Sequence, residues 1–161
     1  MKRLMVLALT AAGLAGCVSL SRTEAVPAET AAVTRGLKVV EVTVDHGAAD
    51  VTPEFDGIFR QRVQARLDGC ARGDRPVRLE ARIDRLDKAN PVMTAVIGGA
   101  NVIRGTARLV DAASGAVVGE HRVGATVVGG RLGVIQMAEA EEQLSDKFAQ
   151  ELCDKVFAPK P

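Results

Sequence analysis

Cysteine offers the widest choice of chemistry in this chain, because a thiol can be modified, can pair with a second thiol or can bind a metal. There are three cysteines, Cys17, Cys70 and Cys153, and two histidines, His46 and His121. Neither histidine has a second histidine or a cysteine nearby at the spacing that metal sites use. We therefore expect no metal site and no cofactor, which leaves the covalent chemistry of the thiols.

The serines, acids and glycines show no catalytic pattern. No GxSxG sequence surrounds a serine, and the glycine pairs at 98–99 and 129–130 belong to no phosphate-binding motif. Neighbouring acids, such as Asp84 with Asp87, are typical of a solvated face. We predict that the protein is not an enzyme and has no catalytic residues.

The N-terminus has the pattern of an export signal. Lys2 and Arg3 precede an uncharged apolar run from Leu4 to Leu14. This run is about half of the ~20 residues that a membrane-spanning helix needs. The pattern therefore predicts a signal peptide that is removed.

The signal ends in the sequence LAGC, Leu14 to Cys17, which resembles the lipobox of bacterial lipoproteins. The resemblance implies cleavage before Cys17, lipid on its thiol and acylation of its new amino group. Two or three acyl chains hold a protein on a membrane where one binds reversibly. Val18 stands where inner-membrane lipoproteins carry aspartate, which favours the periplasmic face of the outer membrane. The alternative is an ordinary secreted protein.

Assigning Cys17 to lipid leaves Cys70 and Cys153 as a pair. In an oxidising compartment such a pair can form a disulfide, and the closed loop would contribute about 4 kcal/mol in the chain-entropy model. The alternative is two buried thiols that pack as small apolar side chains.

Composition limits the partners. The formal net charge is only +1, and the chain contains no Trp or Tyr. A basic footprint for nucleic acid is absent, as are aromatic platforms for stacking sugars. We expect no nucleic-acid partner.

Hydrophobic periodicity predicts six elements. Strands are expected at 37–45, with Val40, Val42 and Val44 on one face, and at 77–87, 102–111 and 116–128; amphipathic helices are expected from a Thr52 cap to about residue 70 and over 137–157. The order β-α-β-β-β-α predicts an α+β fold, a four-stranded, mainly antiparallel sheet with both helices on one face. The predicted organisation is a signal peptide at 1–16, a lipidated cysteine with a flexible tether at 17–36, and one domain at 37–158.

Two apolar, glycine-bearing stretches, 91–100 and 127–135, fit none of these elements. One enters the predicted hairpin of the last two strands and the other leaves it, so they should meet at one end of the sheet. Exposed apolar loops suggest a contact surface for a partner protein, a membrane or another copy. The alternative is that both stretches pack against the core. The candidate partner-contact residues are Val96, Ile97, Gly98, Gly99, Gly129, Gly130 and Leu132.

The segment from Ala95 to His121, with AVIGGAN leading to a D-x-x-S-G hairpin, is similar to a family of uncharacterised bacterial envelope lipoproteins. The resemblance implies a non-enzymatic envelope protein and brings no catalytic residues. We predict an interaction or assembly factor of an envelope complex, with an envelope protein as partner. The alternatives are a carrier of a small apolar ligand or lipid and, second, an envelope hydrolase.

Overall fold

The computed structural model describes residues 18–21, 34, 36–129 and 139–157. Cys17, Gly130 and Leu132 lie outside the described residues, as does the predicted signal peptide. No helix among the described residues is long and apolar enough to cross a membrane.

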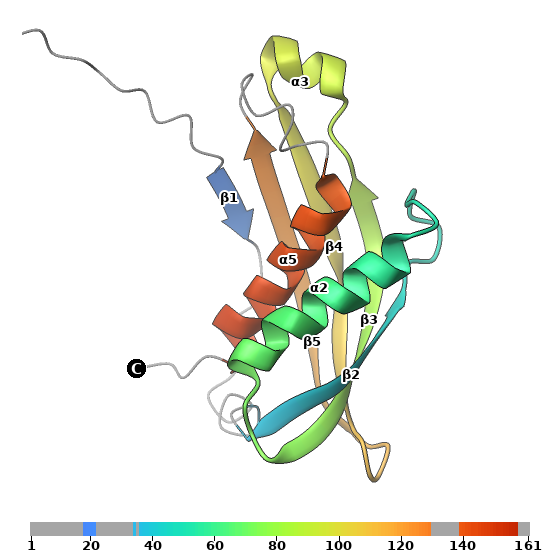
Figure 1. Cartoon of the computed structure of the whole chain (residues 1–161), viewed down its shortest axis with the longest axis vertical. Coiled ribbons are helices and arrows are strands. Elements are labelled where there is room, and N and C mark those ends of the chain that lie inside the picture. The colour runs from blue at the N-terminus through green and yellow to red at the C-terminus, as the bar shows by residue number, and fades with distance from the viewer. Residues whose placement is uncertain (1–17, 22–33, 35, 130–138, 158–161) are drawn as a thin grey trace, which may run out of the picture.

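The molecule is organised around one elongated sheet (Figure 1). Its strands are β1 (Val18–Ser21), β2 (Leu37–Asp45), β3 (Arg75–Asp87), β4 (Gly99–Asp111) and β5 (Val117–Gly129), in the spatial order β1-β5-β4-β3-β2. Only β2 and β3 pair in parallel, because helix α2 (Phe55–Cys70) crosses over between them. The remaining pairs are antiparallel.

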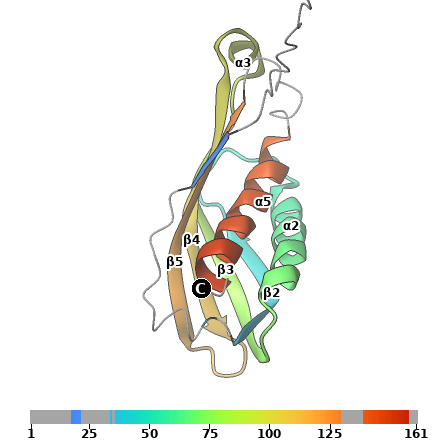
Figure 2. The same cartoon turned by 90° about the vertical axis from the view of Figure 1, so that its left-hand side faces the viewer.

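Two helices cover one face of the sheet and leave the other face open (Figure 2). They are α2 and α5 (Ala140–Leu152), and α5 continues into the π-helical turn η2 (Cys153–Phe157). Phe59 of α2 meets Phe148 of α5 with ring centroids 5.3 Å apart, and both side chains are fully buried. The α+β class and the predicted order of four strands and two helices are confirmed.

A disulfide joins Cys70, at the end of α2, to Cys153, directly after α5, with a Cα–Cα distance of 5.6 Å. It ties the two helices together at the end of the sheet where β2 and β3 begin.

Three local details differ from the expectations. A bulge in β2 between Val39 and Glu41 turns Val40 outward, to 49% exposure, while Val39 and Val42 are buried. Val40 therefore does not share a face with Val42, because the extra residue shifts the alternation. The start of the predicted tether forms β1, whose backbone pairs with the edge of β5.

The third difference concerns Thr52, which does not cap α2. The residue before the helix is Glu54, which makes no side-chain capping bond, and the Thr52 hydroxyl donates instead to Glu141 Oε2, at 2.6 Å. The Thr52 hydroxyl thus binds a carboxylate 89 residues away in the sequence and does not cap the first turn of α2.

Candidate functional site

A short helix, α3 (Pro91–Ile97), stands at the far end of the sheet, beyond the helical layer (Figures 1 and 2). It lies between β3 and β4 and was not expected from periodicity. It belongs to the first of the two glycine-bearing stretches.

Local sequence explains why this segment is helical. Asn90 adopts an extended conformation, and its side-chain oxygen accepts hydrogen bonds from the amides of Val92 (3.0 Å) and Met93 (3.2 Å). Pro91 follows at the first helical position, where its fixed φ and missing N–H cost nothing. The helix is therefore nucleated by an N-cap despite its length.

The end of α3 is fixed by two glycines. Gly98 has φ +89°, a conformation that side chains disfavour, and its amide donates to Thr94 O at 3.0 Å. A Cβ on Gly99 would lie 2.2 Å from Thr94 Oγ1, so only glycine lets the strand pass this close to the helix. Thr94 is fully buried, and its hydroxyl donates to Asn90 O at 2.8 Å. These contacts define both ends of α3 and its position against β4.

The second stretch meets α3 where it enters the sheet. Gly99 pairs with Gly129 and Ala100 with Val128. A Cβ on Gly98 would also lie 3.3 Å from Gly129 O. The structure thus brings Val96, Ile97, Gly98, Gly99 and Gly129 together at one end, as far as the second stretch is described.

Seven large apolar side chains are exposed among the described residues, and four of them lie on α3. Val92 is 73% exposed and Ile97 70%, with Met93 and Val96 at about half. Val128, on the neighbouring strand end, is a fifth. We call these five residues the apolar tip. Val92, Met93 and Val128 were missing from the predicted set, although the asparagine-proline pair before Val92 signals a helix start.

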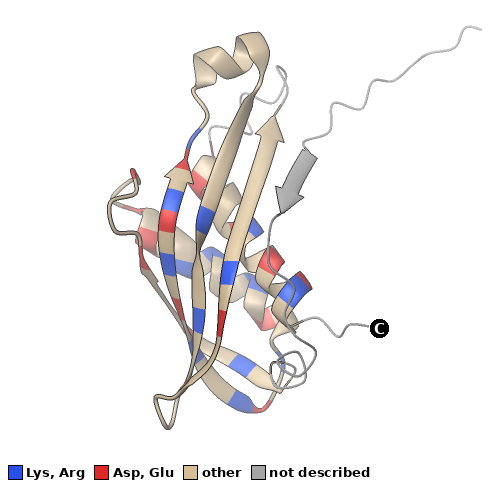
Figure 3. Cartoon of the chain, turned by 180° about the vertical axis from the view of Figure 1, so that it is seen from behind, with Lys and Arg blue, Asp and Glu red and all other residues tan. Residues whose placement is uncertain are grey.

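The apolar tip belongs to a larger uncharged region. Residues 91–103 and 123–129 contain no Asp, Glu, Lys or Arg, and among the described residues α3 and the adjoining ends of β4 and β5 carry no charge in Figure 3. Arg104 marks the boundary. Its side chain lies across Gly124, and its Nη1 donates to the carbonyls of Ile103 (2.7 Å) and Ala125 (2.8 Å).

A buried carboxylate ties the base of α3 to the helical layer. Glu141, in the first turn of α5, accepts from Thr52 N at 2.8 Å and from Lys88 Nζ at 3.2 Å, and Lys88 stands two residues before the Asn90 cap. Burial alone would raise the pKa of Glu141, but the hydrogen bonds from Thr52 and the Lys88 ammonium outweigh it and lower the pKa. Glu141 is therefore held in its charged form and links Thr52 to Lys88, and we call this set of contacts the Glu141 staple.

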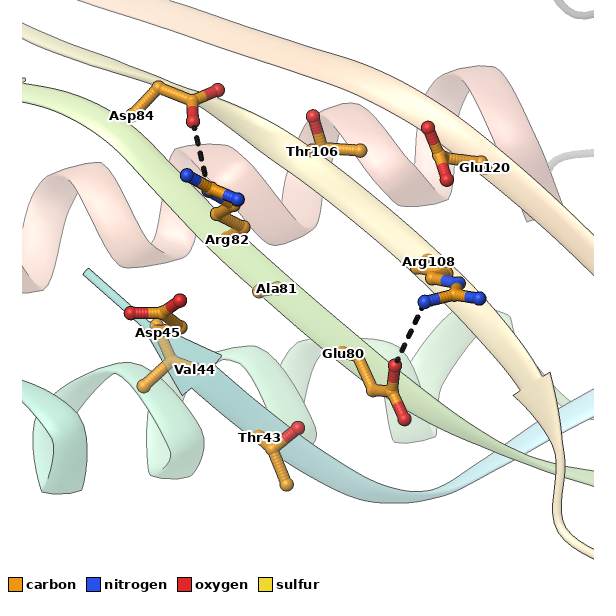
Figure 4. Close-up of a pocket in the computed structure, with 10 residues that line it drawn as sticks. All are labelled: Thr43, Val44, Asp45, Glu80, Ala81, Arg82, Asp84, Thr106, Arg108 and Glu120. Carbon is orange, nitrogen blue, oxygen red and sulfur yellow. Dashed lines mark ion pairs between the residues drawn. The ribbon is translucent and has the colours of Figure 1, made fainter. Parts of the chain in front are cut away.

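The open face of the sheet carries side chains of both charges (Figure 3). In one row Glu80 of β3, Arg108 of β4 and Glu120 of β5 stand side by side. A shallow groove of about 610 Å³ follows this face, and its side chains include an Arg108–Glu80 ion pair at 4.0 Å and an Arg82–Asp84 ion pair at 3.5 Å (Figure 4). The two arginines of the groove thus pair with two of its four acids, and Asp45 and Glu120 are the other two.

The opposite end of the sheet is closed by the turn between β4 and β5. Asp111 Oδ1 accepts from the amide of Ser114 at 2.9 Å and its hydroxyl at 2.8 Å, and Oδ2 accepts from Arg75 Nε at 2.8 Å. The Ser114 amide, Arg75 and the Ser114 hydroxyl hold the pKa of Asp111 far below its ordinary value. All of these partners come from the chain itself.

Neither histidine lies in a ligand cluster. No group of three His, Cys, Asp or Glu side chains able to hold a metal occurs in the part of the chain that the structure describes. His121 is 8% exposed, its Nε2 has no hydrogen-bond partner, and burial lowers its pKa, against a smaller opposing effect of Glu120.

No protein-family model matches the chain, and no curated protein matches it. Among solved structures it is similar to the PelC dodecamer of Paraburkholderia phytofirmans, with a TM-score of 0.47 and 19% identity over 89% of this chain and 100% of that chain. A single-substitution variant of that protein gives 0.47 and 20% over the same shares. A candidate lipoprotein from Caulobacter crescentus CB15 gives 0.49 and 14% over 80% and 93%.

Proposed function

We propose that the protein is a non-enzymatic lipoprotein on the periplasmic face of the outer membrane, where it acts as an interaction or assembly factor of an envelope complex. The observation that carries the contact role is the apolar tip. Fully burying an aliphatic side chain contributes about 1.5–3 kcal/mol, and α3 presents four that are half or more exposed. The Asn90 cap, the glycines at 98 and 99, and the buried Thr94 fix the helix that presents these side chains.

The anchor in this proposal is lipid on Cys17. It is supported by the sequence LAGC after a short apolar run, and by the two remaining cysteines, Cys70 and Cys153, which form a disulfide and so suit an oxidising compartment.

A role as carrier of an apolar ligand is less well supported. A carrier needs a concave, mostly apolar pocket. The groove on the open face is instead lined by Asp, Glu, Arg and Thr side chains, with ion pairs across it (Figure 4). A hydrolase is also less well supported, because two of the four acids of the groove, Glu80 and Asp84, are ion-pair partners of arginine.

Photo-crosslinking in cells tests the contact role. A photoreactive residue is placed at Val96 on the tip, at Thr106 in the groove, and at Ser114 in the opposite turn as the matched control. We expect a defined protein adduct from at least one of the first two positions and none from Ser114. An absence of protein adducts from all three positions would overturn the proposal.

Radioactive palmitate tests the anchor. The wild-type chain should be labelled and should remain with the membrane fraction, whereas Cys17→Ala should not be labelled. Equal label in both proteins would overturn the lipoprotein assignment.

A further inference from the structure

We infer that the apolar tip contacts the bilayer into which the lipid on Cys17 inserts, so that the domain stands on the membrane with α3 downward. This inference rests on the proposed lipidation. It names a lipid surface as the contact of the apolar tip, so the tip then supports the envelope role by docking the domain on the membrane. A protein partner would bind another surface, and the crosslinking position at Thr106 probes the open face of the sheet.

The direction of β1 carries the first step. β1 runs antiparallel to β5, with Ser21 opposite Ala125 and Val18 opposite Val128. Followed backwards from Ser21 to Val18, the chain therefore runs toward Gly129 and the end of the sheet that bears α3 (Figure 1).

Covalent geometry carries the second step. Cys17 is joined to Val18 by one peptide bond, and consecutive Cα atoms are about 3.8 Å apart. Val128 of β5 pairs with Val18 on one side and with Ala100 of β4 on the other, and Ala100 directly follows Gly99. Lipid on Cys17 would thus be attached within one residue of the strand ends that carry the apolar tip. A flexible tether of 17–36 would have left the orientation of the domain free, but the pairing of β1 removes that freedom.

The chemistry of this end fits a lipid surface. Val92, Met93, Val96 and Ile97 project from the outermost element, and the first five register pairs of β4 and β5, from Gly99–Gly129 to Ile103–Ala125, contain no charged residue. At about 3.4 Å per residue these pairs span roughly 17 Å. Interfacial elements bury their apolar faces about 5–10 Å deep, so Arg104 and the charged face would remain in water.

The experiment places a photoreactive residue at Met93 in the full-length, lipidated protein, reconstituted into vesicles of phosphatidylethanolamine and phosphatidylglycerol. The same residue at Ser114 is the positional control. We expect lipid adducts from position 93 at about ten times the yield from position 114, because position 114 lies at the opposite end of the sheet.

Two matched charge variants sharpen this result. Ile97→Asp, in the tip, should reduce the yield of lipid adducts from position 93 about tenfold or more, since a carboxylate resists entry into the bilayer. Val117→Asp, on a 44% exposed valine at the other end of β5, should leave the yield unchanged. Circular dichroism and the oxidised state of the Cys70–Cys153 pair confirm that both variants are folded.

The outcomes separate this inference from the proposed function. A protein adduct in place of lipid at position 93 in cells would overturn the inference in favour of a protein-docking tip. Equal lipid yields at positions 93 and 114, with lipid on Cys17 confirmed by mass spectrometry, would overturn it while the proposed anchor stands. An unmodified Cys17 would overturn both.

Discussion

The two ends of the sheet are built in opposite ways. At the turn end, polar and covalent links are completed within the chain: Asp111 binds Arg75 and Ser114, and the Cys70–Cys153 disulfide joins the helices. At the α3 end the polar side chains of Thr94 and Asn101 are fully buried, whereas the aliphatic side chains of Val92 and Ile97 are exposed by 70% or more.

This contrast separates stability from contact. The turn end exposes single valines such as Val117, whereas the α3 end gathers five exposed apolar side chains into one surface that association would bury. Substitutions at the two ends should therefore differ in what they change, and the following predictions are ordered by their expected effect on the free energy of unfolding.

Loss of the disulfide should have the largest effect. The bond closes a loop with a sequence separation of 83 residues, and in the chain-entropy model its removal costs about 4 kcal/mol. Urea unfolding of the Cys70→Ala, Cys153→Ala double variant should show this loss, and reductant should lower the stability of the wild type but not of the variant. Equal midpoints for oxidised and reduced wild type would contradict the prediction.

Glu141→Gln should cost about 2 kcal/mol, because it keeps the shape of a buried side chain but removes the charge that Thr52 and Lys88 bind. Since folding lowers the pKa of Glu141 below its ordinary value of 4.5, its contribution is complete above that value and is lost as the pH falls through the folded pKa. Unfolding measured from pH 3 to pH 7 should be less pH-dependent in the variant.

Glu142→Gln, one residue along the same helical turn and less buried, is the matched control for that staple. It should stay within about 0.5 kcal/mol of the wild type. A loss as large as that of Glu141→Gln would mean that helix-terminal charge in general, not the staple, stabilises this region.

His121 should make the free energy of unfolding depend on pH. Burial lowers its folded pKa below 6.5, so the unfolded chain takes up the proton first. Stability should be highest above pH 6.5 and should fall as the pH drops from 6.5 through the folded pKa, by at most about 1.4 kcal/mol per unit. His121→Gln should flatten this slope between pH 7 and pH 5, and an unchanged slope would show that another group titrates there.

The smallest effect on stability should come from the apolar tip. The Val96→Ser, Ile97→Ser double variant alters two exposed side chains and should change the free energy of unfolding by less than about 0.5 kcal/mol. The same variant should lose the contact of the tip with its target in crosslinking from Met93. A stability loss near 2 kcal/mol would mean that the tip is part of the core and would remove the contrast between the two ends.

Sequence periodicity predicted the long elements well and the short ones poorly. The strand at 37–45 has the expected bounds because alternating valines mark it, yet the face of Val40 was wrong, since a bulge leaves no local signature. The seven residues of α3 are too few for a helical period, and their helix depends on Asn90 and on close contacts with Gly99.

The sequence predicted that the two glycine-bearing stretches meet, but it did not predict which side chains they would expose. The hairpin of the last two strands required the two glycine-bearing stretches to meet, and Gly99 does pair with Gly129. The outward orientation of Val92 and Met93 could not be foreseen, because it follows from burying Thr94 on the other side of the same helix. The short strand β1, with the sequence VSLS, does alternate, but four residues are too few for a strand period to be recognised, and β1 pairs with the edge of β5.

The pairing of β1 also bears on how the protein avoids aggregation. An open sheet has two lateral edges whose free backbone groups can recruit strands of other molecules. On one side the outermost described strand is β1, only four residues long, and on the other it is β2, interrupted by its bulge and carrying the exposed charges of Lys38 and Glu41. Strand addition is therefore disfavoured at β2 and beside β1. β1 covers only Ala125–Val128 of β5, so residues 117–124 of β5 form the longer open edge among the described strands, and there the charged residues Glu120 and Arg122 disfavour pairing with another molecule.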